Sequence, residues 1–287
     1  MPKIHTATQS AHRATEIFRT FSDSDPDLVD LGIPEVTDTI GGMFPGTLVG
    51  IAARQNVGKS SLILTMAMQS SHKIGVVELE DGPDVWGARL LAYHTGIKPT
   101  KIRRKDLTEE EKEVIQDTLA KEDLEGPLIS YCIGGTVDEI CKATKHLVEA
   151  GCGAIVLNYL QKVRGHREDR RTEVGDTMNS FLRACAPDPD EDYPGAVPVI
   201  MSQLTRGRPD KEPWPSEMKE SGDIENECRL ILMLWRDNQD SLLTHLKVSK
   251  SSMGGGGLRF DYRYNQSECL VPVSDSFGPL EDGEDDF

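Results

Sequence analysis

Short apolar runs rich in β-branched residues alternate along this chain with segments of helical periodicity. Two helical segments open with capping boxes, Thr108 with Glu111 and Thr136 with Glu139. Apolar runs of this length are typical of strands buried on both faces of a sheet. The alternation predicts an α/β fold, with a mostly parallel twisted sheet and helices on both faces. The predicted strands are residues 47–52, 74–79, 127–133, 153–158, 197–202, 229–235 and 242–248.

Composition narrows the class of protein. With 37% hydrophobic and 28% charged residues among 287, the chain is typical of a soluble globular protein. It has no apolar run near the roughly 20 residues that cross a bilayer, and its N-terminus lacks the apolar core of a secretion signal. We therefore expect a cytoplasmic protein with no membrane partner. Six scattered cysteines without a C-x-x-C pair are expected to be buried thiols.

We expect one main domain, residues 31–270, because it contains all the predicted strands and the chain shows no internal repeat. Residues 1–30 are expected to be a linker, in which residues 8–20 form either an oligomerisation helix or a frayed tail. Residues 271–287 are predicted to be an acidic, disordered tail. The acidic segment 186–195 is expected to be a surface loop.

Charge is unevenly distributed. The formal net charge of −16 opposes nucleic-acid binding unless basic residues cluster, because phosphate contacts need Lys and Arg. Locally basic segments do occur, at residues 98–105, 162–171 and 205–211. The total charge therefore does not exclude a nucleic-acid partner.

The stretch GIAARQNVGKSSL, residues 50–62, has the form of a phosphate-binding loop. It joins a predicted strand to a helix starting near Lys59, so backbone N–H groups and the helix N-terminus would face an anion. Lys59 would contact the β and γ phosphates, and Ser60 would ligate Mg²⁺. Ala53 stands where the usual pattern has its first glycine, so a chance Gly-Lys-Ser is an alternative on this motif alone.

Acidic residues follow at the end of the next predicted strand, where Glu78 and Glu80 lie on the same side. Ligands bind at the carboxyl ends of strands in open α/β sheets, so Glu80 is placed to polarise an attacking water. Arg89, nine residues later, is a candidate to neutralise charge on a phosphoryl group. Taken alone, each of these residues is also explained as a solvated surface charge.

Five segments in colinear order resemble the ATPase domain of DnaB-family hexameric replicative helicases, which are RecA-like P-loop NTPases, and the likeness is to the phage type. The segments are GIPEVTDTIGGMFPGTLVGIAARQNVGKSSL, VVELEDGPDVWGARLLA, GAIVLNYLQKV, VPVIMSQLTR and MKESGDIENECRLILMLWRD, which span roughly residues 32 to 265. A colinear series is far more specific than any one motif. The family also uses an A-R-x-x-x-G-K-[ST] loop, so the resemblance implies that Ala53 is a family trait.

The resemblance implies ATP and Mg²⁺ as cofactors and assigns roles residue by residue. It makes Glu80 the water-activating base, Arg89 a phosphate contact in the same subunit and Gln203 the γ-phosphate sensor. The residues expected to bind nucleotide are Ala53, Arg54, Asn56, Val57, Gly58, Lys59, Ser60, Ser61 and, toward a neighbouring subunit, Lys250. Those expected to hold the metal are Ser60 and, through water, Asn158. Those expected to bind single-stranded DNA are Lys219, Glu220, Ser221 and Gly222.

The resemblance also implies partners. The family assembles homo-oligomeric rings, commonly hexamers, around single-stranded DNA. The terminal EDGEDDF resembles the acidic tails by which phage replication proteins dock on partners, although a solvating tail explains it equally well. A phage-encoded protein of this kind would act in the cytoplasm of a bacterial host.

Two positions depart from the family pattern. The family's Walker B aspartate, which holds a Mg²⁺-bound water, is Asn158 here; an amide oxygen can accept a hydrogen bond from that water but adds no charge. Whether Glu78 or Glu80 compensates is open. The family's K-x-R pair falls on Lys250 and Ser252, so the arginine finger is missing unless another arginine, Arg259 or Arg236, substitutes.

Three functions stay open at this point. The first is an ATP-dependent DNA helicase motor that translocates on single-stranded DNA in replication. The second is a catalytically weakened, helicase-like ATP-binding switch, which Asn158 and Ser252 favour. The third is a RecA/RadA-like recombination ATPase, which shares the fold and differs in its DNA loops.

Overall fold

The structure is a computed structural model. It describes residues 28–121, 124–133, 135–163, 170–188, 191–204, 212–218, 221–238, 241, 243–265 and 269–273. Its elements follow the order α2 (Pro34–Ile40), β1 (Val49–Ala53), α3 (Lys59–Gln69), β2 (Lys73–Glu78), α4 (Pro83–Thr95), α5 (Pro99–Arg104), α6 (Glu109–Leu119), β3 (Leu128–Tyr131), α7 (Val137–Glu149), β4 (Cys152–Asn158), η1 (Leu160–Lys162), α8 (Arg170–Cys185), β5 (Val197–Gln203), η2 (Pro215–Glu217), α9 (Ser221–Glu227), β6 (Leu230–Trp235), β7 (Leu243–Ser251), β8 (Arg259–Tyr264) and β9 (Leu270–Pro272).

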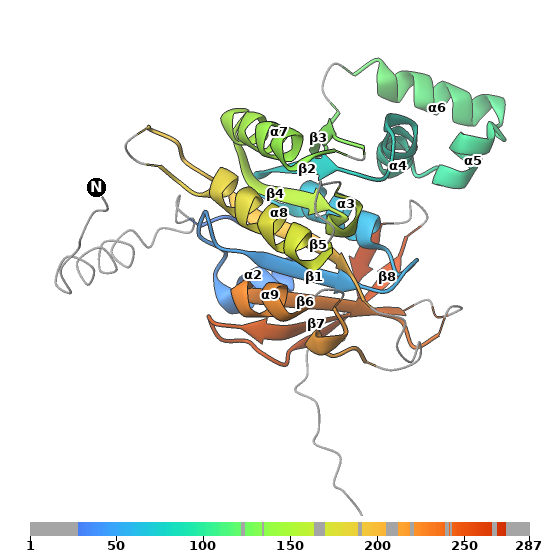
Figure 1. The fold of residues 1–287 in the computed structure, drawn as a ribbon. Coiled ribbons are helices and arrows are strands. Elements are labelled where there is room, and N and C mark those ends of the chain that lie inside the picture. The colour runs from blue at the N-terminus through green and yellow to red at the C-terminus, as the bar shows by residue number, and fades with distance from the viewer. Residues whose placement is uncertain are drawn as a thin grey trace, which may run out of the picture.

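The described strands form one nine-stranded sheet in the order β3-β2-β4-β5-β1-β6-β7-β8-β9 (Figure 1). From β3 to β6 in this order neighbouring strands are parallel, and β7, β8 and β9 extend the sheet in antiparallel pairing. All seven predicted strands are present, and helices cover both faces. The predicted fold class is confirmed.

The sequence patterns do not predict β8 and β9. In β8, RFDYRY, polar residues alternate with aromatic ones, and Phe260 and Tyr262 are the buried members. The central parallel strands β1, β5 and β6 are buried along nearly their whole length, whereas in β8 buried residues alternate with partly exposed ones. β9 has three residues, too few for any periodicity to be recognised.

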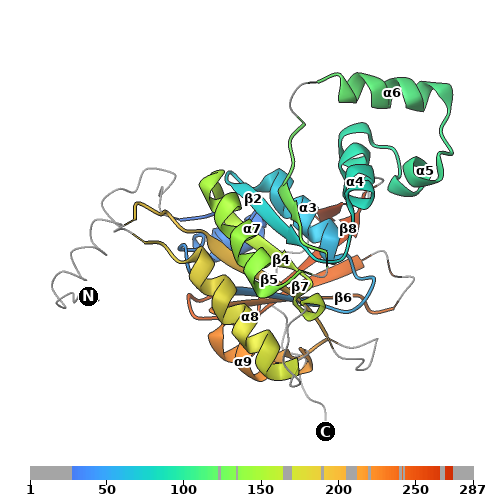
Figure 2. The same cartoon turned by 45° about the horizontal axis from the view of Figure 1, so that its top comes forward.

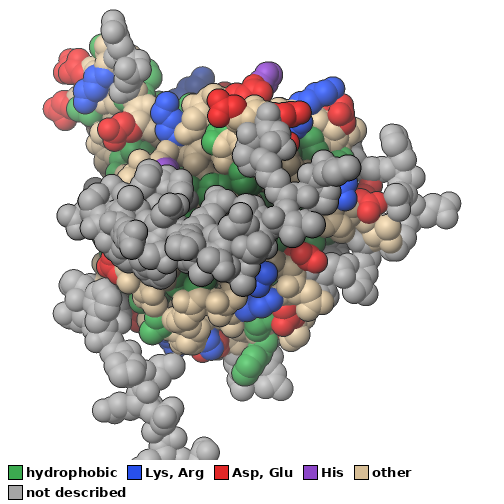
Figure 3. All heavy atoms as spheres, turned by 90° about the vertical axis from the view of Figure 1, so that its left-hand side faces the viewer, with side chains coloured by type: hydrophobic (Ala, Val, Ile, Leu, Met, Phe, Trp, Pro, Cys, Tyr) green, Lys and Arg blue, Asp and Glu red, His purple; other side chains and the backbone are tan. Residues whose placement is uncertain are grey.

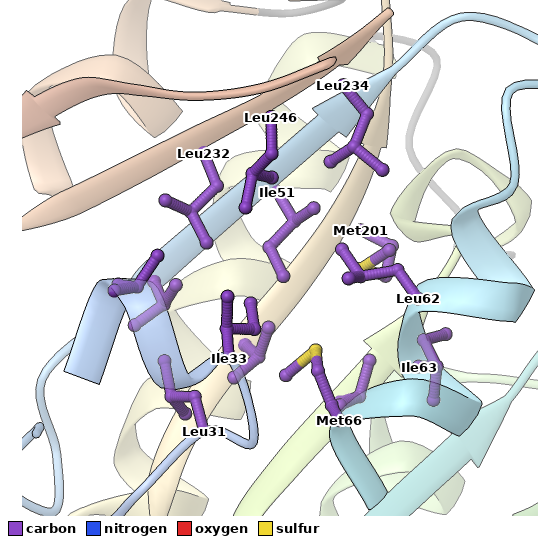
Figure 4. Packing of buried hydrophobic residues seen from close by; sticks show 14 of the residues in the cluster. Leu31, Ile33, Ile51, Leu62, Ile63, Met66, Met201, Leu232, Leu234 and Leu246 are labelled. Carbon is purple, nitrogen blue, oxygen red and sulfur yellow. The ribbon is translucent and has the colours of Figure 1, made fainter. Parts of the chain in front are cut away.

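Two hydrophobic clusters lie on opposite faces of the sheet. On one face, Leu62 and Met66 of α3 pack against Ile51 of β1, and α2 extends this layer (Figure 4). On the other face, Ile140 of α7 and Phe181 of α8 fill the second cluster. Successive strand residues alternate between the two clusters, as pleated strands require. A strand residue therefore lies on the same face of the sheet as the residues two positions before and after it, and on the opposite face from its direct neighbours in sequence.

Helices α4, α5 and α6 stand together at one side of the molecule (Figure 2), and α4 contributes the buried Trp86 to the hydrophobic cluster under α3. Both predicted capping boxes are present: the Glu111 N–H donates to Thr108 at 3.2 Å and the Glu139 N–H donates to Thr136 at 3.4 Å. A hydrogen bond from Lys101 lowers the pKa of the Glu111 carboxyl. The basic segment 98–105 lies on α5 in this outlying group.

Four of the six cysteines are buried as predicted, whereas Cys132 and Cys141 are partly exposed. Burial raises the pKa of Cys152 to about 11 and that of Cys228 to about 12. In the part of the chain that the structure describes, no helix is both long and apolar enough to span a membrane.

Several predictions concern residues outside the described ranges. These are the linker up to residue 27 with its helix at 8–20, the basic segment 205–211 and the tail from 274. The domain boundaries stay predictions. The described part of segment 186–195 is a surface turn in which Asp188 and Tyr193 pair as a short bridge between α8 and β5.

Candidate nucleotide-binding site

The loop between β1 and α3 presents an open helix N-terminus. Gly58 is the N-cap of α3 and has φ 101°, and no side chain caps the first turn. The N–H groups of this turn therefore lack a side-chain acceptor, which is the arrangement that binds phosphate in many proteins. Asn56 also takes a left-handed conformation, with φ 62°. The sequence predicts this strand–loop–helix unit, with the helix beginning at Lys59.

Lys59 and Glu80 interact electrostatically across the loop. The Lys59 ammonium lies 3.5 Å from the carbonyl oxygen of Arg54, within its own loop. Burial lowers the pKa of Lys59, and the negative charge of Glu80 opposes that shift. A half-buried cation beside an uncapped helix N-terminus is a strong anion-binding combination.

Four parallel strands end in residues that share one face of the sheet. Ala53 on β1 pairs with Gln203 on β5, and Glu78 on β2 pairs with Asn158 on β4. Two positions earlier, each strand has a residue of the cluster under α3: Ile51, Met201, Val76 and Val156. Side chains two residues apart point to the same face of a strand, so the four end residues face α3. The structure thus brings the phosphate loop and the predicted polar residues to one edge.

The two acids after β2 differ in position. β2 ends at Glu78, whose side chain is completely buried, whereas Glu80 lies beyond the strand and its side chain is 49% exposed. Glu80 lies 3.6 Å from the ammonium of Lys162 on η1. Strand alternation predicts equivalent placement for both acids, and the turn after Glu78 is what separates them.

Tyr159 orients Gln203, although no sequence motif marks Tyr159 as part of the site. The Tyr159 hydroxyl donates to Oε1 of Gln203 at 2.5 Å. Tyr159 has φ 74°, an uncommon conformation for a bulky residue, directly after the end of β4. Burial, followed by the charge of Glu80, raises the pKa of its hydroxyl. With Oε1 occupied, the Gln203 side chain has its NH₂ group left to meet a ligand.

The arginines of the site are held by acids. Arg89 on α4 forms a 2.7 Å ion pair with Asp81, next to Glu80. Arg54 in the loop forms a 3.3 Å ion pair with Glu217 on η2. Arg89 therefore lies close to the predicted base, and Arg54 connects the phosphate loop to the segment that precedes residue 219.

Tyr264, in the unpredicted strand β8, closes one side of the phosphate loop. Its hydroxyl donates to the carbonyl oxygen of Val57 at 2.7 Å. A Cβ at Gly58 would lie 1.7 Å from that hydroxyl, so a larger residue cannot replace this glycine without moving the tyrosine. Gly58 is required here both for its backbone conformation and for this close contact.

Lys250 lies at the other end of the strands. It pairs with Ile231 near the start of β6, and its ammonium donates to the carbonyl oxygen of Glu225 at 2.5 Å. The start of β6 is level with the start of β1, so the length of β1, more than about 13 Å for five residues, separates Lys250 from the phosphate loop of its own chain. Ser252 follows at the same end, where its N–H donates to the carbonyl oxygen of Arg229 at 2.9 Å.

Neither candidate substitute for the arginine finger is near Lys250. The Arg259 guanidinium lies 5.0 Å from the ring centre of Trp235 and bonds His245 at 2.9 Å. Arg236 follows β6 directly, at the phosphate-loop end, and its guanidinium lies 4.5 Å from the ring centre of Tyr264. Both make contacts inside their own chain.

The predicted DNA-binding residues are described only in part. Lys219 and Glu220 lie outside the described residues. Ser221 and Gly222 form the first residues of α9, and only their backbone is described. The role assigned to these four residues stays a prediction.

The residues predicted to hold a metal suit magnesium. Ser60, in the first turn of α3, offers a hydroxyl, and Asn158, 4% exposed at the end of β4, offers an amide oxygen. Mg²⁺ prefers oxygen ligands and keeps several waters while it binds substrate phosphates, so few protein ligands are needed. Among the described residues, no cluster of three His, Cys, Asp or Glu side chains offers another metal site.

Comparison with known proteins matches residues 29–257 to the DnaB-like helicase C terminal domain. The replicative DNA helicase DnaC of Bacillus subtilis is 30% identical over 276 residues, 87% of this chain and 58% of that protein. The replicative DNA helicase DnaB of Geobacillus stearothermophilus is 30% identical over 261 residues, 83% of this chain and 56% of that protein. The chain thus spans just over half the length of these relatives.

Solved structures share the fold. A structure described as an ATPase domain superposes with a TM-score of 0.77 at 20% identity, covering 94% of this chain and 100% of that one. A structure of a DnaB-like replicative helicase, described with its interactions with primase, superposes with a TM-score of 0.75 at 20% identity, covering 94% of this chain and 67% of that one.

Proposed function

Because this chain belongs to the DnaB-like helicase C-terminal domain family, we propose that it is an ATP-driven motor that translocates on single-stranded DNA during DNA replication. One observation carries the proposal. Lys59, Glu80 and Gln203 converge at the edge of the sheet where the uncapped N-terminus of α3 can receive a phosphate.

In the proposed reaction, water attacks the γ-phosphorus of ATP and the bond from that phosphorus to the ADP oxygen breaks. Glu80, exposed and beyond the end of β2, accepts the proton of the water. Lys59 and the first N–H groups of α3 bind the phosphates, and the Gln203 NH₂ donates to the γ-phosphate. Ser60 and, through water, Asn158 would hold Mg²⁺, which would supply positive charge against the phosphates.

The proposed partners are single-stranded DNA and further copies of the chain. The segment 219–222 would bind DNA, and Arg54 with Glu217 would connect it to the phosphate loop. Lys250 is remote from the phosphate loop of its own chain. It would instead contact the nucleotide bound by a neighbouring subunit in a ring, for example a hexamer. We also propose that the acidic tail docks on a replication partner and that the protein acts in the cytoplasm of a bacterial host.

The face of the molecule in Figure 3 carries basic and acidic side chains side by side. Because the net charge of −16 repels DNA, we expect DNA to bind where basic side chains are gathered locally, in a channel assembled from several subunits. Binding that depends on such a channel should require assembly as well as nucleotide.

A nucleotide-controlled switch with little hydrolysis is the second candidate. It is favoured by Asn158, which adds no charge where a metal is expected, and by Ser252, which replaces the arginine finger. Both losses reduce stabilisation of the transition state without removing the phosphate-binding loop.

ATP turnover with and without single-stranded DNA separates the two candidates. The motor predicts DNA-stimulated turnover that Glu80→Gln lowers by about 10²-fold or more, while binding of a fluorescent ATP analogue is retained. Glu110→Gln, an exposed change on α6, is the matched control and should leave turnover unchanged. Nucleotide binding with turnover at background in the wild type would leave only the switch.

A further inference from the structure

Glu78 occupies an unusual position for an acid. It is the last residue of β2, its side chain is 0% exposed, and its register partner is Asn158, the last residue of β4. Burying a charged group is costly unless it is fully hydrogen-bonded. An acid retained at such a position needs partners that account for it.

Four N–H groups surround the Glu78 carboxyl group. Oε1 accepts hydrogen bonds from the backbone N–H of Glu80 at 2.8 Å and of Asp81 at 3.0 Å. Oε2 accepts from the indole N–H of Trp86 at 2.7 Å and from the side-chain amide of Asn158 at 2.7 Å. Because every partner is a donor, the group acts as an acceptor at all four contacts, which uses the full capacity of a carboxylate. Glu78 has no acceptor position left for a metal or a substrate.

This contact fixes which way the Asn158 amide is turned. The Nδ2 atom must face Glu78, because Oδ1 in its place would set two acceptor atoms 2.7 Å apart. Oδ1 is then the atom directed elsewhere, and Asn158 makes no other side-chain hydrogen bond to a described residue. An aspartate at position 158 would face Glu78 with an acceptor whichever way it turned.

The same carboxylate fixes the backbone that carries Glu80. Its two bonds to the N–H groups of Glu80 and Asp81 hold the turn after β2. Asp81 in turn pairs with Arg89, whose guanidinium lies 5.5 Å from the ring centre of Trp86. The position of Glu80 relative to the phosphate loop therefore depends on an acid that never reaches the nucleotide.

We infer that Glu78 and Asn158 are a matched pair in which Glu78 is the positioning residue of the site: it holds the turn of Glu80 and presents Oδ1 of Asn158 to the metal's water shell. The inference rests on the proposed ATP hydrolysis. The inference gives a physical reason why this chain has Asn158 where the family has an aspartate. The carboxylate of Glu78 is at the end of β2, and the residue opposite it at the end of β4 must be a neutral hydrogen-bond donor. Restoring the family's aspartate at 158 alone then damages the site.

A double-mutant cycle tests the pairing with Glu78→Gln, Asn158→Asp and the two together. In the exchanged pair, the glutamine introduced on β2 can donate to the aspartate introduced on β4, while its oxygen accepts from Glu80 and Asp81. The cycle is repeated in a Trp86→Phe background, because the indole N–H would otherwise face the new carboxamide NH₂. Three quantities are measured: kcat and KM for ATP, the melting temperature without nucleotide, and the Mg²⁺ dependence of fluorescent ATP-analogue binding.

We expect Asn158→Asp and Glu78→Gln each to lower kcat by about tenfold or more, with KM changed by less than about threefold, and to lower the melting temperature by at least about 3 °C. The exchanged pair in the Trp86→Phe background should recover kcat to within about threefold of that parent. Glu35→Gln is the matched control. Glu35, on α2, is another buried acid, and its carboxylate accepts a hydrogen bond from the Tyr262 hydroxyl at 2.7 Å. Loss of this carboxylate should lower the stability of the protein without changing kcat.

Two results would overturn the inference: an increase of kcat in Asn158→Asp alone, or effects on kcat and melting temperature that simply add in the exchanged pair made in the Trp86→Phe background. Failure of the proposed function has a different signature. The wild type would then lack turnover, while coupling between positions 78 and 158 would still be measured in the melting temperatures and in the Mg²⁺ dependence of analogue binding.

Discussion

The two ends of the parallel strands differ in what a single chain completes. At the end with the phosphate loop, residues of β1, β2, β4 and β5 meet, and their contacts lie within one chain. At the other end, the Lys250 ammonium donates to the backbone carbonyl oxygens of Glu225 and Asn226 on α9, about the length of β1 away from the phosphate loop. The proposed nucleotide site at the first end is built from residues of a single chain, whereas under the proposed function Lys250 at the second end would contribute to a site outside its own chain.

Removing Lys59 should have the largest effect, because it tests the self-contained end directly. Lys59→Ala deletes the half-buried cation at the start of α3, and we expect kcat/KM for ATP to fall by about 10²-fold to 10³-fold. Fluorescent ATP-analogue binding measures the loss of affinity. Lys112→Ala, on the surface of α6, is the control. Analogue affinity within twofold of the wild type would show that the loop is no phosphate site.

Lys250→Ala tests the other end. We expect about a tenfold fall in turnover of the assembled protein, with analogue affinity unchanged, because Lys250 is remote from its own loop. Mixed assemblies of Lys250→Ala and Glu80→Gln subunits should regain part of the turnover, since each supplies what the other lacks. If mixing restores nothing, the two ends do not form a shared site.

Tyr159→Phe refines the account of the first end. Without its hydroxyl, the Gln203 amide loses the partner that orients it, and we expect kcat to fall about fivefold with KM little changed. Steady-state kinetics measures this. Tyr193→Phe removes a similar hydroxyl, bonded to the carbonyl of Ala184 at 2.6 Å, and should affect stability alone. Equal kinetics for both variants would remove Tyr159 from the site.

The smallest functional effect is expected in the loop between β7 and β8. Gly255 has φ 71°, and a Cβ there would lie 2.5 Å from Thr39 on α2, so Gly255→Ala should lower the free energy of unfolding by about 1–2 kcal/mol. Gly256→Ala meets no atom within 4 Å and is the matched control. Urea unfolding measures both. A change of analogue affinity in Gly255→Ala would mean that the two ends are coupled within one chain.

Sequence reasoning predicts the parallel part of the sheet because its strands are continuously apolar, and it locates the phosphate loop because that loop is local in sequence. It does not predict β8, where burial alternates, and so it misses Tyr264 against Val57. Tyr159 is missed for another reason. Its role depends on an uncommon backbone conformation and on a hydrogen bond to Gln203, which lies 44 positions away in the sequence. Such contacts depend on strand order, which no local pattern contains.

Strand order also decides when the site can form. β1 and β2 follow each other in the chain, yet β5 and β4 lie between them in the sheet. The phosphate loop and Glu80 therefore reach their relative positions only after β4 and β5, up to Gln203, have been synthesised and inserted between β1 and β2. On the ribosome, nascent chains that stop short of β5 should not retain nucleotide, and the binding edge should be among the last parts of the fold to mature.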